Sequence, residues 1–356
     1  MPFVHLHVHS QYSLLKSTVR IDKLFEMAKA GGMPAVALTD YGNLHGSGEF
    51  LEKAKAYGVQ PILGLDISVV HGPASEKSTK YPSYGLVLLA KNAQGLQNLH
   101  HLVSLAHLEG FYYKPRVDLD MLEKYHEGLI ALSGNHFGAP ARMIQDHRLD
   151  LAEEMIQKYA QIFGKDDYYL ELIDTGLKIQ ETINNHLIEF SKKLGVKLVA
   201  TNDVHYLDQK DSHAHDVMLC IGSGKQLDDP GRLKYQTDEF YFRSAEEMKK
   251  KFAGCPEAII NTLEIAEKCK LNVKHEGYHM PRFELPAGQT AESFLEKISR
   301  EGLKDRLEKM FAAERTDPSL QEEIRKKYFD RLHVELDCIS KVGFASYFLI
   351  VSDFIN

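Results

Sequence analysis

Three histidines near the start of the chain, His5, His7 and His9, alternate with apolar residues. The run that contains them, residues 3–10, has the period of a β-strand. Because successive side chains of a strand point to opposite faces, we expect the three imidazoles to share one face. Imidazole is a common zinc ligand, so this strand is a candidate metal-binding element.

A second alternating pair follows an apolar run far downstream, where residues 197–201 lead into Asp203 and His205. Histidine and carboxylate at strand ends are the ligand types that a zinc or manganese site requires. The alternative is that these histidines are buried and satisfied by hydrogen bonds, since short motifs also arise by chance. The two motifs together favour a metal site.

The composition is that of a soluble globular protein, because 44% of the 356 residues are hydrophobic and 26% are charged. No apolar run approaches the roughly 20 residues that cross a bilayer, and the N-terminus lacks the pattern of a signal peptide. Four widely separated cysteines fit free thiols in a reducing cytoplasm. The net charge of -7 argues against a surface that grips nucleic acid everywhere.

Short apolar runs alternate with helical patterns over the first 200 residues. The expected strands cover residues 3–10, 35–38, 61–70, 86–90, 128–132, 168–173 and 197–201, and the expected helices cover 21–30, 47–56, 93–106, 149–163 and 179–194. This alternation predicts a parallel sheet with helices outside. Reactive residues just after the strands favour a closed β/α barrel of about seven strands. An open doubly wound sheet is the alternative, but the Gly-rich phosphate loops that usually accompany it are absent from the sequence.

Helical patterns replace the alternation from about residue 208. They cover residues 208–222, 245–252, 256–270, 291–312 and 319–341. Two prolines mark a linker near 275–290, which predicts domains at 1–275 and 276–356. The final segment, 342–356, is rich in large apolar residues and ends without a helix cap. We therefore expect the chain to continue beyond Asn356 in a longer protein.

Several long motifs resemble one family. They read FVHLHVHSQYSLL, ALTDYGNLHG, PILGLD, LVLLAKN, LIALSG, VATNDVHYL, LDDPGRLKYQTDEFYFRSAEEM and ELDCISKVGFASYFLIVSDFIN, in this order from residue 3 to 356. This sequence resembles the bacterial replicative DNA polymerase III alpha subunits. The resemblance implies a distorted β/α barrel, the PHP (polymerase and histidinol phosphatase) domain, followed by the helical start of the polymerase core.

The resemblance also implies an activity and partners. The full-length protein would be a DNA-directed DNA polymerase of the bacterial cytoplasm, which acts on primer–template DNA and uses Mg²⁺ at residues beyond this chain. Its partners would be other subunits of the polymerase holoenzyme, among them a proofreading exonuclease subunit. No catalytic residue of polymerisation falls within this chain, and no membrane association is implied.

The ligand positions of metal-binding PHP domains can be carried over one by one. The resemblance assigns retained ligands to His7, His9, Asp66, Asp203 and His205. The other positions fall on Lys16, Tyr41, Gly85 and Asn135, which do not supply the neutral nitrogen or sulfur donors of a zinc cluster. We therefore expect a degenerate site that holds no metal, or at most one zinc or manganese ion. We also expect Lys16 to insert among the carboxylates as a substitute for the metal charge.

Three functions follow as alternatives. We favour a structural and partner-docking barrel without hydrolytic activity. The second is a metal-dependent 3′-5′ proofreading exonuclease or phosphoesterase at the barrel mouth, which the retained ligands favour. The third, a stand-alone phosphatase of the histidinol phosphatase type, is opposed by the polymerase-like segment after residue 208.

One further segment, residues 111–116, interleaves aromatic and basic residues. Tyr112, Tyr113, Lys114 and Arg116 are of the types that stack on unpaired bases and contact phosphates. Packing of the preceding helix end is the alternative explanation. We therefore expect these four residues as candidate nucleic-acid contacts.

Overall fold

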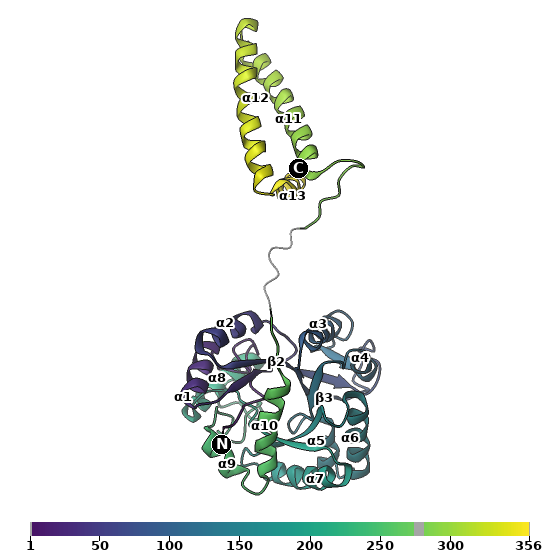
Figure 1. Ribbon diagram of the computed structural model, residues 1–356. Helices are drawn as coiled ribbons and strands as arrows, with labels where there is room; N and C mark the ends of the chain where they lie inside the picture. The colour runs from purple at the N-terminus through teal and green to yellow at the C-terminus, as the bar shows by residue number, and fades with distance from the viewer. Residues whose placement is uncertain (1, 274–280, 356) are drawn as a thin grey trace. The chain divides into compact units, whose positions relative to one another are not determined.

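The computed structural model of the chain describes residues 2–273 and 281–355 and divides it into two units, Met1–Val273 and Lys274–Asn356 (Figure 1). The first unit is built on a seven-stranded sheet. Its strands are β1 (Ala35–Leu38), β2 (Gln60–Val70), β3 (Ser83–Ala90), β4 (Arg116–Asp118), β5 (Leu129–Leu132), β6 (Tyr168–Ile173) and β7 (Lys197–Thr201). They lie in the order β1-β2-β3-β5-β6-β7, and β4 pairs with β2.

The sheet is mixed, so the expectation of a wholly parallel sheet was wrong at one strand. Strand β3 runs antiparallel to both of its neighbours, β2 and β5, whereas the other pairs are parallel. The physical reason lies in the connection from β2 to β3, residues 71–82, which contains no helix. A parallel neighbour requires a crossover, usually helical, whereas a direct loop returns the chain in the opposite direction.

The opening segment lies between β1 and β7, the first and last strands in this order, although it forms no regular strand. On one side, Ala37 N in β1 donates to His5 O at 2.9 Å, and Thr39 N just after β1 donates to Val8 O at 2.8 Å. On the other side, Val204 N, just beyond β7, donates to His7 O at 3.1 Å. The segment thus closes the sheet into a distorted barrel, as the sequence predicted.

The hydrogen bonds to β1 contain a bulge of one residue. In a parallel ladder, donors two residues apart bond to carbonyls two residues apart, yet the β1 donors meet carbonyls three residues apart, at His5 and Val8. The extra residue changes which face the side chains occupy. Leu6 packs inside the barrel, whereas Val8 packs outside it. His5 therefore does not share a face with His7 and His9, contrary to the expectation from simple alternation.

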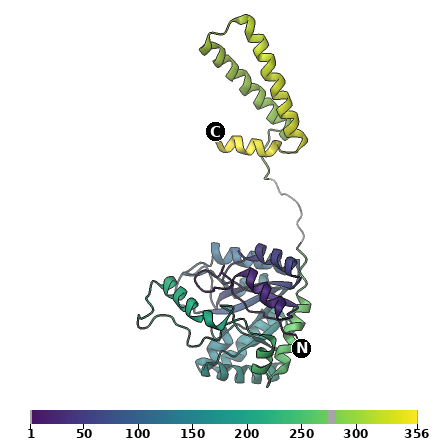
Figure 2. The same ribbon diagram turned by 90° about the vertical axis from the view of Figure 1, so that its left-hand side faces the viewer.

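Helices cover the outer face of the sheet (Figures 1 and 2). They are α1 (Ile21–Ala30), α2 (Ser47–Tyr57), α3 (Ala93–Leu108), α4 (Leu119–Lys124), α5 (Ala139–Gln145), α6 (Leu149–Phe163) and α7 (Lys178–Leu194). In α1 the residues Ile21, Leu24, Phe25 and Ala28 are buried, which is the spacing of one helical face. The sequence analysis did not predict α4, α5 or β4, because they are short.

The unit continues through η1 (Gln209–Asp211), α8 (Ser212–Ser223), α9 (Ala245–Lys251) and α10 (Pro256–Lys268). Figure 2 shows α8 and the loop after it projecting from one side of the unit. Helix α10 packs on β7 and contributes Ile265 and Ala266 to the cluster inside the barrel. Polar contacts fix it in place: Asn261 Nδ2 donates to Leu198 O at 2.7 Å, and Gln60 Nε2 donates to Ala266 O at 2.6 Å.

The second unit consists of three helices, α11 (Ala291–Glu314), α12 (Pro318–Lys341) and α13 (Ala345–Ile355). Its small core contains Leu295, Leu336, Ala345 and Leu349. Among the described residues, no single helix is long and apolar enough to cross a membrane, although α12 and α13, bent by 114°, pass that test as a pair.

The contact of α10 with the barrel interior yields a stability prediction. Replacing Ile265, which is fully buried, by alanine should lower the free energy of unfolding by about 2–5 kcal/mol, because a cavity would remain. Urea denaturation of the two proteins measures this difference. The control is Ile260→Ala on the same helix, where the side chain is 47% exposed and the change should stay within about 0.5 kcal/mol. Equal losses for both variants would contradict the proposed role of α10.

Candidate metal centre at the barrel mouth

The five retained ligand positions come together at one end of the barrel. His7 and His9 come from the opening segment, Asp66 from β2, and Asp203 and His205 from the residues after β7. His9 Nε2 lies 3.1 Å from Asp203 Oδ1 and 3.2 Å from His7 Nε2. His7 Nε2 lies 3.4 Å from Asp66 Oδ2, and His205 Nε2 lies 3.3 Å from Asp203 Oδ1. Residues more than 190 positions apart in the chain thus share one buried cluster.

Local backbone features aim these side chains. The bulge described above turns His7 and His9 toward the barrel mouth. Asp203 adopts a left-handed conformation with φ of 45°, which is uncommon for a residue other than glycine. The neighbouring Asn202 holds this turn, because its Nδ2 donates to Glu239 O at 2.8 Å and to Tyr241 O at 2.7 Å.

A sixth residue, Glu171 in β6, belongs to the cluster and was missed by the sequence analysis. His7 Nδ1 donates to Glu171 Oε1 at 2.7 Å, and the hydroxyl of Thr201 donates to the same oxygen. Glu171 Oε2 has no hydrogen-bond partner among the described residues. The available signal was an acidic residue in the middle of the otherwise apolar run Tyr168–Ile173. A carboxylate that orients a histidine in this way is typical of metal sites.

Two of the four substituted positions contact the remaining ligands. The ring of Tyr41 stacks on His9 with 3.9 Å between ring centroids. Asn135 Nδ2 donates to Asp203 Oδ2 at 2.8 Å. Both side chains therefore contact members of the cluster directly.

The other two of these positions are Gly85, which leaves open space, and Lys16, which places a positive charge at the rim. A Cβ atom added at Gly85 would meet only Asp66 Oδ1, at 3.8 Å, so the position opens into free space. Lys16 is exposed, and its Nζ lies 4.4 Å from the centroid of the Tyr41 ring. Among the described residues, Lys16 forms no ion pair with a carboxylate of the cluster. The expectation that Lys16 inserts among the carboxylates was therefore wrong.

Histidine supplies the positive charge instead. Burial disfavours the protonated form of His7, but the carboxylates of Glu171, Asp203 and Asp66 outweigh burial and hold its pKa well above the ordinary value. Burial raises the pKa of Asp66, although His7 opposes this shift. Burial also opposes ionisation of Asp203, yet His7 and His205 hold the pKa of its carboxyl well below the usual range. Burial lowers the pKa of His9, so this imidazole is neutral.

The donor set fits one divalent ion. His7 and His9 with Asp66 form one possible group of ligands, and His9 with Asp203 and His205 forms another. The two groups share His9. Four ligands at about 2.0–2.1 Å from a tetrahedral zinc ion lie roughly 3.3 Å from one another. The separations found here run from 3.1 Å between His9 and Asp203 to 3.8 Å between His9 and Asp66.

Three other predicted residues lie apart from this cluster, whereas Lys114 borders a cavity together with Asp66. His5 Nε2 donates to Arg243 O at 2.8 Å and packs against Phe242. Arg116 is only 4% exposed, and its guanidinium donates to backbone carbonyls, which removes it from the expected nucleic-acid contacts. Tyr113, in contrast, is 85% exposed.

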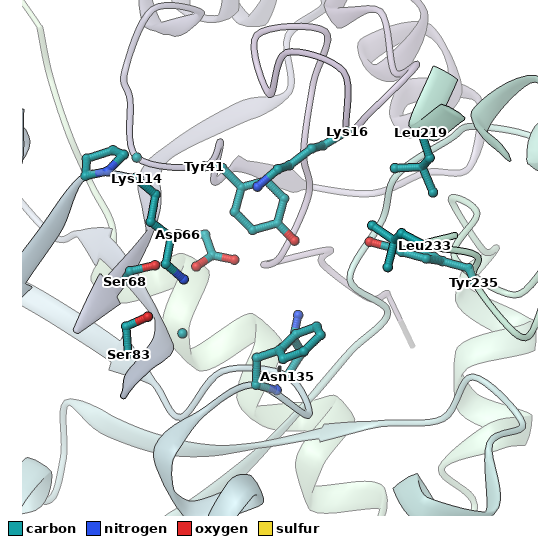
Figure 3. A pocket seen from close by; sticks show the side chains of 14 residues that line it. Lys16, Tyr41, Asp66, Ser68, Ser83, Lys114, Asn135, Leu219, Leu233 and Tyr235 are labelled. Atoms are coloured by element: carbon teal, nitrogen blue, oxygen red, sulfur yellow. Dashed lines mark hydrogen bonds between the residues drawn. The ribbon is translucent and has the colours of Figure 1, made fainter. Parts of the chain in front are cut away.

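A cavity of about 350 Å³ adjoins the centre (Figure 3). Asp66 and Asn135 border it from the side of the cluster, and Lys16, Tyr41 and other rim residues complete it. In Figure 3 these side chains point toward one another from different elements of the barrel. The cluster is therefore accessible to a small molecule.

Comparison with known proteins assigns the family. The PHP domain family matches residues 5–175, and the family described as the bacterial DNA polymerase III alpha NTPase domain matches residues 293–356. DNA polymerase III subunit alpha of Aquifex aeolicus is 40% identical over 371 residues, which covers 99% of this chain and 31% of that protein. The chain belongs to the bacterial DNA polymerase III alpha subunit family. The subunit of Borreliella burgdorferi is 41% identical over an alignment that covers 99% of this chain and 30% of that subunit.

The chain thus spans about 30% of the length of these alpha subunit relatives. Among solved structures, a protein from Bifidobacterium adolescentis described as a metal-dependent phosphoesterase is 13% identical, with a TM-score of 0.41. The superposition covers 57% of this chain and 88% of the phosphoesterase chain. This likeness is too distant to carry a functional argument.

The contact between His7 and Glu171 yields a second prediction. Replacing Glu171 by glutamine should lower the pKa of His7 and lower the free energy of unfolding at neutral pH by about 1–3 kcal/mol, because the buried imidazolium loses its nearest anion. Histidine titration by NMR and urea denaturation measure the two effects. The control, Glu154→Gln on the exposed face of α6, should change stability by about 0.5 kcal/mol or less. An unchanged His7 titration would show that Glu171 does not set its charge.

Proposed function

We propose that this chain is the N-terminal part of a replicative DNA polymerase subunit, and that its barrel is a structural and partner-docking module without hydrolytic activity. One observation carries the proposal. Residues at former ligand positions satisfy the ligands that remain, since Tyr41 stacks on His9 and Asn135 donates to Asp203. These contacts support a mouth that keeps its fold without a multinuclear metal cluster.

The whole protein's activity is proposed from the family. The named relatives are polymerase subunits, and the match at residues 293–356 lies in the second unit. We propose that the first unit is the PHP domain and that the second begins the polymerase core. DNA-directed DNA synthesis with Mg²⁺ on primer–template DNA would then depend on residues beyond Asn356. Other subunits of a bacterial cytoplasmic holoenzyme, including a proofreading exonuclease, are the proposed docking partners.

One divalent ion would fit the barrel mouth. His7, His9, Asp66 and Asp203 are the residues that would hold it, and Glu171 would orient His7. When bound, such an ion supplies Lewis-acid polarisation of a phosphoryl oxygen. Phosphoester cleavage by paired ions uses a clamp on both the attacking and the leaving oxygen. The substitutions at Tyr41, Gly85 and Asn135 remove the donors for such a pair, which supports the inactive assignment.

A second candidate function is a metal-dependent 3′-5′ exonuclease or phosphoesterase at the same site. The convergence of the five retained ligands favours it, as does the adjoining cavity. This candidate requires that a mononuclear centre suffices for hydrolysis.

The two functions differ in a measurable way. Purified full-length protein should extend a primed template with Mg²⁺, yet should release no nucleotides from a mismatched 3′ end with added Zn²⁺ or Mn²⁺. The barrel variant Asp203→Asn should leave primer extension unchanged once folding is verified by circular dichroism. Elemental mass spectrometry after dialysis without chelator should find far less than one ion per chain. Degradation that Asp203→Asn and a chelator both abolish would instead establish the exonuclease.

A further inference from the structure

The cavity beside the centre has two chemically different ends. Lys114, Ser68 and Ser83 border one end, and Leu219, Leu233 and Tyr235 border the other (Figure 3). Lys16 and Tyr41 lie between these two sets in the same figure. A cavity of about 350 Å³ lies within the range of small-molecule sites, which are mostly apolar with a few convergent polar groups.

The polar end and the rim beside it carry lysines without a carboxylate partner and hydroxyls without a hydrogen bond. Within residues 2–273 and 281–355, neither Lys16 nor Lys114 has a carboxylate at ion-pair distance. The half-buried hydroxyls of Ser68 and Ser83 form no hydrogen bond with any described residue. These groups need an acceptor, and hydroxyl and ammonium donors together match a phosphate.

The two ammonium groups also affect each other. Burial is the largest influence that lowers the pKa of Lys114, and the charge of Lys16 comes next. Asp66 acts in the opposite direction but more weakly. Two lysines and one carboxylate, Asp66, border this cavity, and a bound anion would relieve the repulsion between the lysines.

The apolar end suits a flat aromatic group. Leu233 is 58% exposed, although it borders the cavity, and Tyr235 is held in place by its edge contact with His205, at 5.3 Å between ring centroids. An aromatic side chain can stack on a nucleobase of any kind. The two leucines add apolar contact beside it. The open space at Gly85 leaves room between the two ends.

We propose that this cavity is a metal-independent binding site for a mononucleotide. The phosphate would contact Lys16, Lys114 and the hydroxyls of Ser68 and Ser83, and the base would contact Tyr235, Leu219 and Leu233. The two lysines would supply charge that paired metal ions would supply in a hydrolytic site. The inference does not depend on whether the barrel docks a partner or hydrolyses a phosphoester.

The test is calorimetric titration of the full-length protein with dAMP in EDTA. Lys16→Met and Lys114→Met should each weaken binding by about tenfold or more, because each removes a charge-assisted contact. The control is Lys55→Met on α2, a lysine outside the cavity, which should bind dAMP as the parent protein does. Deoxyadenosine, which lacks the phosphate, should bind at least about tenfold more weakly than dAMP. Matching melting curves establish that the variants fold.

Several results would overturn the proposal. Equal affinity of the lysine variants and the parent protein would exclude the proposed phosphate contact. Inorganic phosphate or pyrophosphate that binds as tightly as dAMP would exclude the base contact. Binding that disappears in EDTA would make the site metal-dependent. A single-stranded oligonucleotide that binds far more tightly than dAMP, with the same sensitivity to Lys16→Met, would identify a nucleic-acid end as the ligand.

Discussion

Three carboxylates are buried at the barrel mouth, and one imidazole contacts all of them. His7 lies 2.7 Å from Glu171, 3.4 Å from Asp66 and 3.4 Å from Asp203. Buried carboxylates without a cation are costly, so a positive charge at this point is a condition for the fold of the mouth. The protonated form of His7 provides that charge within the protein. An ion would provide it from outside, and it would then compete with the proton on His7.

The two ends of the barrel differ in how their polar groups are satisfied. At the end near α10, Lys197 and Lys268 both contact Glu264, and Lys268 also contacts Asp167. At the mouth, Asp203 has a left-handed backbone and the oxygen Glu171 Oε2 has no partner among the described residues. Ion pairs at one end and a buried polar cluster at the other follow the usual division of β/α barrels into a stabilising face and a face that carries the site.

Most regular elements could be predicted from the sequence because their apolar periods are clear. The strands at Ala35–Leu38 and Tyr168–Ile173 and the helix at Ile21–Ala30 have the predicted bounds. The antiparallel β3 could not be predicted from its own residues, because strand direction depends on the loop before it. The five residues that come together at the mouth were singled out by their spacing and by the family resemblance. Glu171 was missed because one acidic residue in a buried strand has no spacing partner, and its role appears only when β6 lies beside His7.

The bulge in the opening segment makes the length of the chain there as consequential as its composition. Leu6 and Val8 are two residues apart, yet Leu6 packs in the cluster inside the barrel and Val8 in the cluster outside it. The imidazole of His7 lies on the same side of the sheet as Leu6. Deleting one residue between His5 and Val8 would return the ladder to a regular register and exchange the faces of everything that follows. A core valine would then face the barrel mouth and the imidazole of His9 would face the outer helices. The number of residues between His5 and Val8 is therefore as much a requirement of the mouth as the imidazole of His7.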